Sequence, residues 1–106
     1  MTEWKGACFS AEKLYGMYTH KRPCRIQVEN GTIILYSYWL RKPLFSCTLD
    51  NILQVQEVKT LGNFYSLMST TGQKGRESRA VSMNKRNRES FRQWCRETFP
   101  ERFVSL

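Results

Sequence analysis

The sequence has little of the chemistry from which most active sites are built. It contains a single aspartate, Asp50, and a single histidine, His20, and its glutamates are scattered singly along the chain. Hydrolytic sites and metal sites usually need paired carboxylates or clusters of carboxylate and imidazole groups. A phosphate-binding loop is also missing, because Gly72-Gln-Lys-Gly75 is too short and precedes a predicted strand. We therefore expect no catalytic residues, no metal site and no cofactor.

Cysteines are present, but not in a pattern that binds zinc or forms a disulfide framework. The four cysteines are widely spaced and include no Cys-x-x-Cys pair: Cys8, Cys24, Cys47 and Cys95. We expect reduced thiols. Cys24 lies beside Lys21, Arg22 and Arg25, whose charges would lower a thiol pKa, although a buried strand cysteine is the commoner arrangement. The sequence leaves the reactivity of Cys24 open.

Long apolar runs are also absent. The N-terminal residues Met-Thr-Glu-Trp-Lys-Gly contain no apolar segment of the kind found in signal peptides. No run elsewhere approaches the ~18 apolar residues of a membrane span. We expect a soluble, cytoplasmic protein.

Positive charge and aromatic side chains, in contrast, are plentiful. The 106 residues include 17 Lys and Arg against 9 Asp and Glu, a formal net charge of +8, and 13% of them are aromatic. The length and the hydrophobic content predict one globular domain, residues 1–106. The charge favours phosphate-rich partners, and the excess of arginine over lysine favours planar contacts to phosphates and bases. A basic surface that only aids solubility is the alternative.

The strongest local pattern is Asn30-Gly31 between two runs rich in β-branched and aromatic residues. Both turn residues readily adopt the positive φ of a type I′ turn, so the pattern predicts a β-hairpin. The two-residue turn places Glu29 opposite Thr32 and Cys24 opposite Ser37.

The second strand of this hairpin is apolar on both faces. We expect it to run as far as Leu40, with Ile33, Leu35 and Trp39 on one face and Tyr38 on the other. A strand of this kind is typical of a central position in a sheet that is covered on both sides.

Four later segments also read as strands: residues 44–49, 52–58, 64–70 and 78–83. Near the N-terminus, Phe9-Ser-Ala-Glu-Lys-Leu14 predicts the start of a helix with Ser10 as its N-cap. Residues 14–18 could equally pair as a strand, so the structure of residues 10–18 stays open.

The C-terminal segment has the period of a helix. Its apolar residues fall on one face of a helix that starts near Asn84 or Asn87 and stops before Pro100: Phe91, Trp94, Cys95, Thr98 and Phe99. The predicted fold is therefore of the α+β class. It is an antiparallel β meander that forms a small barrel or two packed sheets, capped by a C-terminal amphipathic helix.

An up-and-down meander would gather many cations at one rim. These residues are Lys21, Arg22, Arg41, Lys42, Lys59, Lys85, Arg86 and Arg88. Arg92 and Arg96 extend the helical part of this set as a cationic stripe. We take all ten as the candidate polyanion-binding site, with Tyr38 as the aromatic residue best placed for base stacking. Lys74, Arg76 and Arg79 would lie at the opposite end.

Residues Ile26 to Phe99 resemble the pleckstrin-homology-like superfold, in particular its bacterial members. The resemblance rests on Leu49-Asp-Asn-Ile-Leu-Gln-Val-Gln-Glu-Val58, which is similar to their Leu-x-x-Ile-x-x-Val strand entry, and on Trp94 in the closing helix. It implies two roughly orthogonal sheets with the helix at one open end. The sequence departs from the phosphoinositide-binding pattern, because Pro23 interrupts the basic residues of the first strand loop and Arg86-Asn87-Arg88 lies at the helix instead.

We therefore expect a non-enzymatic module that binds a phosphate-bearing polyanion, with RNA or another single-stranded nucleic acid as first choice. A pleckstrin-homology-like module that binds a protein peptide or an anionic membrane surface is the alternative. The sequence gives neither a specific ligand, nor a pathway, nor the oligomeric state.

Overall fold

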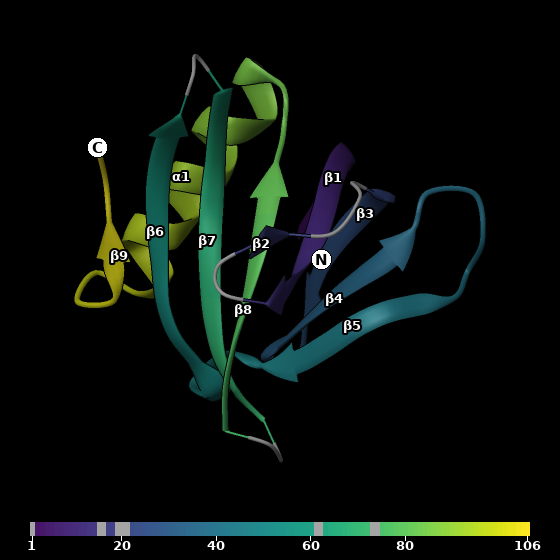
Figure 1. Ribbon diagram of the computed structural model, residues 1–106, viewed down its shortest axis with the longest axis horizontal. Helices are drawn as coiled ribbons and strands as arrows, with labels where there is room; N and C mark the ends of the chain where they lie inside the picture. The colour runs from purple at the N-terminus through teal and green to yellow at the C-terminus, as the bar shows by residue number, and fades with distance from the viewer. Residues whose placement is uncertain (1, 15–16, 19–21, 61–62, 73–74) are drawn as a thin grey trace.

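The computed structural model describes residues 2–14, 17–18, 22–60, 63–72 and 75–106 (Figure 1). The elements in chain order are β1 (Thr2–Leu14), β2 (Met17–Tyr18), β3 (Arg22–Glu29), β4 (Thr32–Ser37), β5 (Pro43–Thr48), the short 3-10 turn η1 (Leu49–Asn51), β6 (Ile52–Thr60), β7 (Asn63–Gly72), β8 (Gly75–Ser82), α1 (Lys85–Thr98) and β9 (Phe103–Val104). The predicted α+β class with a C-terminal helix is confirmed.

The strands form two packed layers that share β1. Neighbouring strands follow the order β5-β4-β3-β1-β8-β7-β6-β9, with β2 added on β1. The meanders β3–β5 and β6–β8 lie on opposite sides of β1, and Figure 1 shows their strands running at a steep angle to each other. In the described part of the chain β5 does not pair with β6, so the sheet is not closed into a barrel. Instead the chain passes between the layers at η1, where Leu49 N donates to Gly31 O at 2.9 Å.

The β3–β4 hairpin has the register that its turn predicts. Glu29 pairs with Thr32 and Cys24 with Ser37. Asn30 and Gly31 have φ values of 51° and 72°, as a type I′ turn requires. This prediction is confirmed because the two-residue turn leaves no freedom in the pairing.

The sequence left residues 10–18 open between a helix that starts at Ser10 and a strand. The strand is correct, because Thr2–Leu14 form β1 and Met17–Tyr18 form β2. Pairing on both sides of this strand overrides the local capping pattern: Phe9 lies opposite Arg22 of β3 and also opposite Val81 of β8. A shift of register between Trp4 and Ala7 lets β1 bend from one layer to the other. The single continuous meander is also wrong, since β5 and β6 do not pair in the described chain and β1 joins the two three-strand meanders through β3 and β8.

The helix α1 agrees with its predicted span. Asn84 is the N-cap, and its side chain accepts a hydrogen bond from Asn87 N. Phe91, Cys95 and Phe99 are buried against the sheets, and Trp94 is half-buried. In Figure 1 the helix lies behind β6, β7 and β8.

The core centres on Trp4, a β1 residue that is 2% exposed. Its ring centroid lies 5.0 Å from that of Phe91 and 5.3 Å from that of Trp94, both in edge-to-face geometry. Trp39, in contrast, was expected on the core face of a longer strand and is 75% exposed. That expectation is wrong because β4 ends at Ser37, so the alternation of the strand does not reach Trp39.

Candidate functional site

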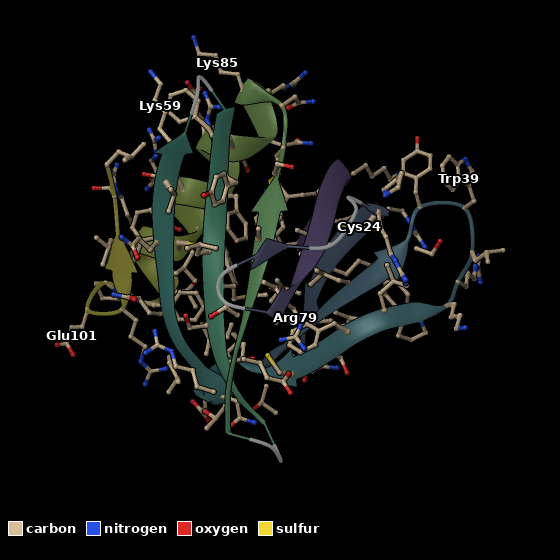
Figure 2. The ribbon with its side chains drawn as sticks, viewed as in Figure 1. Cys24, Trp39, Lys59, Arg79, Lys85 and Glu101 are labelled. Atoms are coloured by element: carbon tan, nitrogen blue, oxygen red, sulfur yellow. The ribbon has the colours of Figure 1, made fainter. Side chains whose placement is uncertain are left out.

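The loop between β4 and β5 carries the most exposed aromatic side chains of the described chain. Tyr38 is 44% and Trp39 is 75% exposed, and their ring centroids lie 5.4 Å apart in edge-to-face geometry. Backbone hydrogen bonds hold the base of the loop: Tyr38 N donates to Pro23 O at 3.2 Å and Ser37 N donates to Lys42 O at 3.1 Å. The two rings therefore lie on an anchored loop, on which Figure 2 labels Trp39.

A shallow cavity of about 350 Å³ lies at the base of these rings and is lined by Lys5, Arg25, Tyr38, Trp39, Leu40 and Arg41. Arg25 and Arg41 also line a neighbouring cavity of about 400 Å³, together with Gln27 and Tyr36. Both cavities lie on the outer face of β1, β3 and β4, because the alternate residues Cys24, Ile26 and Leu35 are buried. We call the combined surface the loop site and define it by its charged and aromatic members: Lys5, Arg25, Tyr36, Tyr38, Trp39 and Arg41.

The hairpin register creates the contact at the centre of the loop site. Arg25 lies directly opposite Tyr36 on the paired strand, and its guanidinium carbon is 5.4 Å from the centre of the tyrosine ring. The Nε atom of Arg25 is buried and has no hydrogen-bond partner among the described residues. A buried guanidinium nitrogen without an acceptor is unfavourable. Arg25 lines both cavities, so its guanidinium could donate to an oxygen ligand bound there.

One acidic side chain, Glu3, lies beside the loop site. Lys5 Nζ lies 3.8 Å from a carboxylate oxygen of Glu3, whose other oxygen accepts a hydrogen bond from Gln27 Nε2 at 2.6 Å. In the part of the chain that the structure describes, Arg25 and Arg41 form no ion pair. The surface around the aromatic rings therefore has a positive potential that is only partly neutralised at Lys5.

The predicted rim divides into two groups. Arg22, Arg41 and Lys42 lie near the open end of the β3–β4 hairpin, whereas Lys59, Lys85, Arg86 and Arg88 lie around the β6–β7 turn and the start of α1. Figure 2 shows Lys59 and Lys85 extending past one end of the molecule, well away from Trp39. Lys21 lies outside the described residues. The groups lie apart because β5, which follows Arg41 and Lys42, does not pair with β6, which contains Lys59, in the described chain.

The two remaining cations of the predicted stripe have different surroundings. Arg92 is bound to the buried carboxylate of Glu57, because its Nε and Nη2 atoms both lie 2.8 Å from Glu57 Oε2. Glu57 therefore neutralises the charge of Arg92, and we leave Arg92 out of the site. Arg96 is exposed in the last turn of α1, far along the helix from Lys85.

At the far end, arginines make internal contacts. Arg79 bonds to Glu77 at 2.8 Å and to Thr70 Oγ1 at 3.2 Å, and its guanidinium carbon lies 3.6 Å from the centre of the Phe45 ring. Arg76 Nη2 donates to Ser69 Oγ at 3.2 Å. Lys74 is outside the described residues. The two described arginines thus tie β8 to its neighbours.

The sequence reasoning identified Tyr38 but missed Arg25, Lys5 and the exposure of Trp39. The predicted hairpin register already set Arg25 opposite Tyr36, so that pair was within reach of the sequence. Lys5 could not be found, because it lies on the unpredicted strand β1, whose pairing with β3 brings it to the same cavity as Arg25.

Other kinds of site find no support among the described residues. No group of three or more His, Cys, Asp and Glu side chains is placed to hold a metal ion in the described ranges. Cys24 is buried in the core. Within the same ranges, no helix combines the length and apolar character needed to cross a bilayer.

No protein-family model matches the chain, and neither does any curated protein sequence.

Proposed function

We propose that the chain is a non-enzymatic, cytoplasmic module that binds single-stranded nucleic acid, RNA in particular, across the loop site. The observation that carries this proposal is the exposed ring pair Tyr38 and Trp39 above a cavity lined by Lys5, Arg25 and Arg41. Aromatic platforms beside cations are the combination by which proteins hold unpaired bases and their phosphates.

The exposure of Trp39 has an energetic consequence. A tryptophan that is 75% exposed leaves most of its apolar ring in water, and a stacked base would cover that ring. Stacking of one base on an aromatic side chain stabilises a complex by ~1–3 kcal/mol. In this proposal Trp39 and Tyr38 hold bases, while Arg25 and Arg41 receive the phosphates between them.

The arrangement favours single strands over duplexes. In a duplex both faces of each base are stacked within the helix, so an aromatic side chain can cover a base only where the strand is unpaired. The loop site also lies on a sheet face and has no helix that could enter a major groove. The ligand class is therefore a single strand rather than a duplex.

Tryptophan fluorescence tests the proposal directly. Of the three tryptophans, Trp4 is buried and Trp94 is half-buried, so quenching by an added oligouridylate would come mainly from Trp39. We expect saturable quenching in the wild type, and a loss of ~1–3 kcal/mol of binding free energy in the Trp39→Ala variant as measured by fluorescence anisotropy of a labelled oligonucleotide.

Leu53→Ala is the matched control, because Leu53 is also an exposed apolar residue, 44% accessible, but lies on β6. It should bind like the wild type, and both variants should melt near the wild-type temperature. Wild-type affinity in both Trp39→Ala and Tyr38→Ala would refute the stacking proposal. Binding should also weaken with salt, with a log–log slope of about −0.7 for each phosphate contacted.

A second candidate function has one observation in its favour. Trp39 and Leu40 are exposed next to Arg41 and Lys42. An apolar loop tip beside cations is also typical of proteins that dock on anionic membranes, as the resemblance to pleckstrin-homology-like domains would suggest. Cosedimentation with phosphatidylserine vesicles, with oligouridylate as competitor, separates the two. Vesicle binding without oligonucleotide binding would favour the membrane module. If the partner is instead a protein peptide, the other form of this alternative, the protein would bind neither the vesicles nor the oligouridylate.

A further inference from the structure

A second group of cations surrounds Phe64, on the β6–β7 hairpin and the first turn of α1. We call it the helix-end cluster: Lys59, Lys85, Arg86 and Arg88. Lys59 Nζ lies 4.9 Å and the guanidinium carbon of Arg88 4.2 Å from the centre of the Phe64 ring. Lys85 and Arg86 are exposed beside them. Three elements, β6, β7 and α1, thus contribute to one cationic surface.

The positive charges of this surface are not balanced by nearby acidic side chains in the described chain. Three of its cations lie in the first turn of α1, where the helix dipole is already positive, and that turn contains no acidic residue. Within the described ranges none of the four cations forms an ion pair. Arg88 Nε is in addition buried without a hydrogen-bond partner in that part of the chain. The arrangement is unfavourable for the protein alone, and a bound anion would relieve it.

The helix-end cluster borders the loop site at one point. Asn87 of the first helical turn donates a hydrogen bond from its side chain to the carbonyl oxygen of Lys5, and Lys5 lines the loop cavity. One turn further on, Trp4 Nε1 donates to Ser90 Oγ at 3.1 Å. The start of α1 is therefore fixed against β1, next to the residue at which the loop site ends.

We infer that one nucleic-acid strand passes from the loop site over Lys5 to the helix-end cluster, with bases on the loop site and only phosphates on the cluster. The inference rests on the proposed function and deepens it, since it gives the strand a path and a minimum length. The cluster offers cations, and in the described chain its only aromatic ring, Phe64, is already covered by Lys59 and Arg88. It would therefore contact phosphates without regard to base identity.

The path predicts a dependence on strand length. Single-stranded sites on small β-domains cover about 4–16 nucleotides. We expect an oligouridylate of about four nucleotides to bind the loop site alone, and one of about twelve to reach both surfaces. The longer strand should bind more tightly and with a steeper salt dependence, because it displaces more counterions.

Single charge reversals on α1 provide the test. Lys85→Glu, Arg86→Glu and Arg96→Glu change the net charge equally, at exposed positions at opposite ends of the same helix. With the longer strand, we expect Lys85→Glu and Arg86→Glu each to reduce the salt slope by about 0.7, the value for one phosphate contact. With the shorter strand they should bind like the wild type. Arg96→Glu is the control and should change neither the salt slope with the longer strand nor the binding of the shorter strand. Acidic residues near a helix N-terminus favour the helix, so instability would not explain the losses.

The possible failures are distinguishable. Equal losses in all three variants would mean diffuse attraction and would overturn the inference, as would losses with the short strand that match those with the long one. In both cases Trp39 would still be quenched and the proposed function would stand. If neither strand binds the wild type or quenches Trp39, the proposed function itself fails, and the strand path with it.

Discussion

Trp4 Nε1 donates a hydrogen bond of 3.1 Å to Ser90 Oγ, which lies 86 positions later in the chain. The bond joins β1 to α1, and the Trp4 ring packs against Phe91 and Trp94 on the same helix. Because β1 also pairs with both β3 and β8, this contact connects the helix to both layers. Together with the hydrogen bond from Asn87 to the Lys5 carbonyl, it holds the start of α1 beside the loop site.

We expect Trp4→Ala to lower the free energy of unfolding by ~3–5 kcal/mol, because it leaves a cavity beneath the helix. Ser90→Ala should cost only ~1 kcal/mol, since it removes one hydrogen bond while the ring remains packed. Trp4→Phe separates the two contributions, since it retains an aromatic ring and loses the donor. Urea denaturation measures all three. A Trp4→Ala variant as stable as the wild type would mean that the helix is held mainly by other contacts.

The sequence predicted those parts of the fold whose causes are local. Asn30-Gly31 determines the hairpin register through two positive φ angles, and the helix from Lys85 is marked by its cap and its apolar period. In β1 a local signal was misleading, because Ser10 resembles an N-cap while its neighbours pair with strands that follow it in the chain. Pairing over such sequence separations leaves no local pattern.

The same distinction applies to the candidate site. Tyr38 was identified because it lies close to the basic residues Arg41 and Lys42 at the end of the predicted strand. Trp39 was misassigned because alternation was continued past Ser37, whereas the pairing of β4 with β5 shifts register between Leu35 and Tyr36 and the strand then ends. Arg92 was counted as a surface cation because its partner Glu57 lies on a different element, 35 positions away.

The ion pair of Arg92 with Glu57 should contribute to stability rather than to binding. Glu57 is 6% exposed, so Arg92→Met would leave a carboxylate buried without its partner, at a cost of about 3 kcal/mol. The double variant Glu57→Leu, Arg92→Met should recover most of that loss, because it removes both charges. Thermal denaturation checks the comparison. Arg96→Met is the matched control and should stay within ~0.5 kcal/mol of the wild type. An equal loss in the single and double variants would contradict the pairing argument.

The thiols of Cys95 and Cys47 should be poor nucleophiles in the folded protein. Burial, and secondarily the negative charge of Glu57, raises the pKa of Cys95 well above 9.0. Burial also raises the pKa of Cys47, although the charge of Arg79 partly opposes the shift. We expect iodoacetamide to modify Cys95 at neutral pH only after denaturation, as peptide mass mapping would show. Rapid modification of the native protein would contradict the burial of this thiol.

The raised pKa of Cys95 also has a consequence for stability. Below the pKa of the unfolded thiol, both states hold the proton and stability is unaffected. As the pH rises above that value, the unfolded state ionises while the folded state stays neutral, so stability falls by up to ~1.4 kcal/mol per pH unit. The difference in unfolding free energy between the wild type and Cys95→Ala should therefore shrink from neutral to alkaline pH.

Asn84 offers a way to separate stability from binding at the helix-end cluster. Its Oδ1 atom accepts a hydrogen bond of 2.9 Å from Asn87 N, and it precedes the three cations of the first turn. Asn84→Asp retains the acceptor and adds a negative charge where the helix dipole favours one, so the helix should be unchanged or gain ~0.3–1 kcal/mol. The same charge lies beside the proposed phosphate path, so long oligouridylates should bind more weakly, while short ones are unaffected.

Asn84→Ala is the complementary variant. It loses the cap and should cost ~1 kcal/mol of stability, but it leaves the charge of the cluster intact and should bind long strands like the wild type once folded. Thermal melting and fluorescence anisotropy on the same samples measure both quantities. If binding affinity and stability change in the same direction in both variants, the variants affect binding only by changing the stability of the helix, and direct contact of the cluster with phosphates is contradicted. If binding follows charge while stability moves in the opposite direction, the start of α1 itself contacts the phosphates.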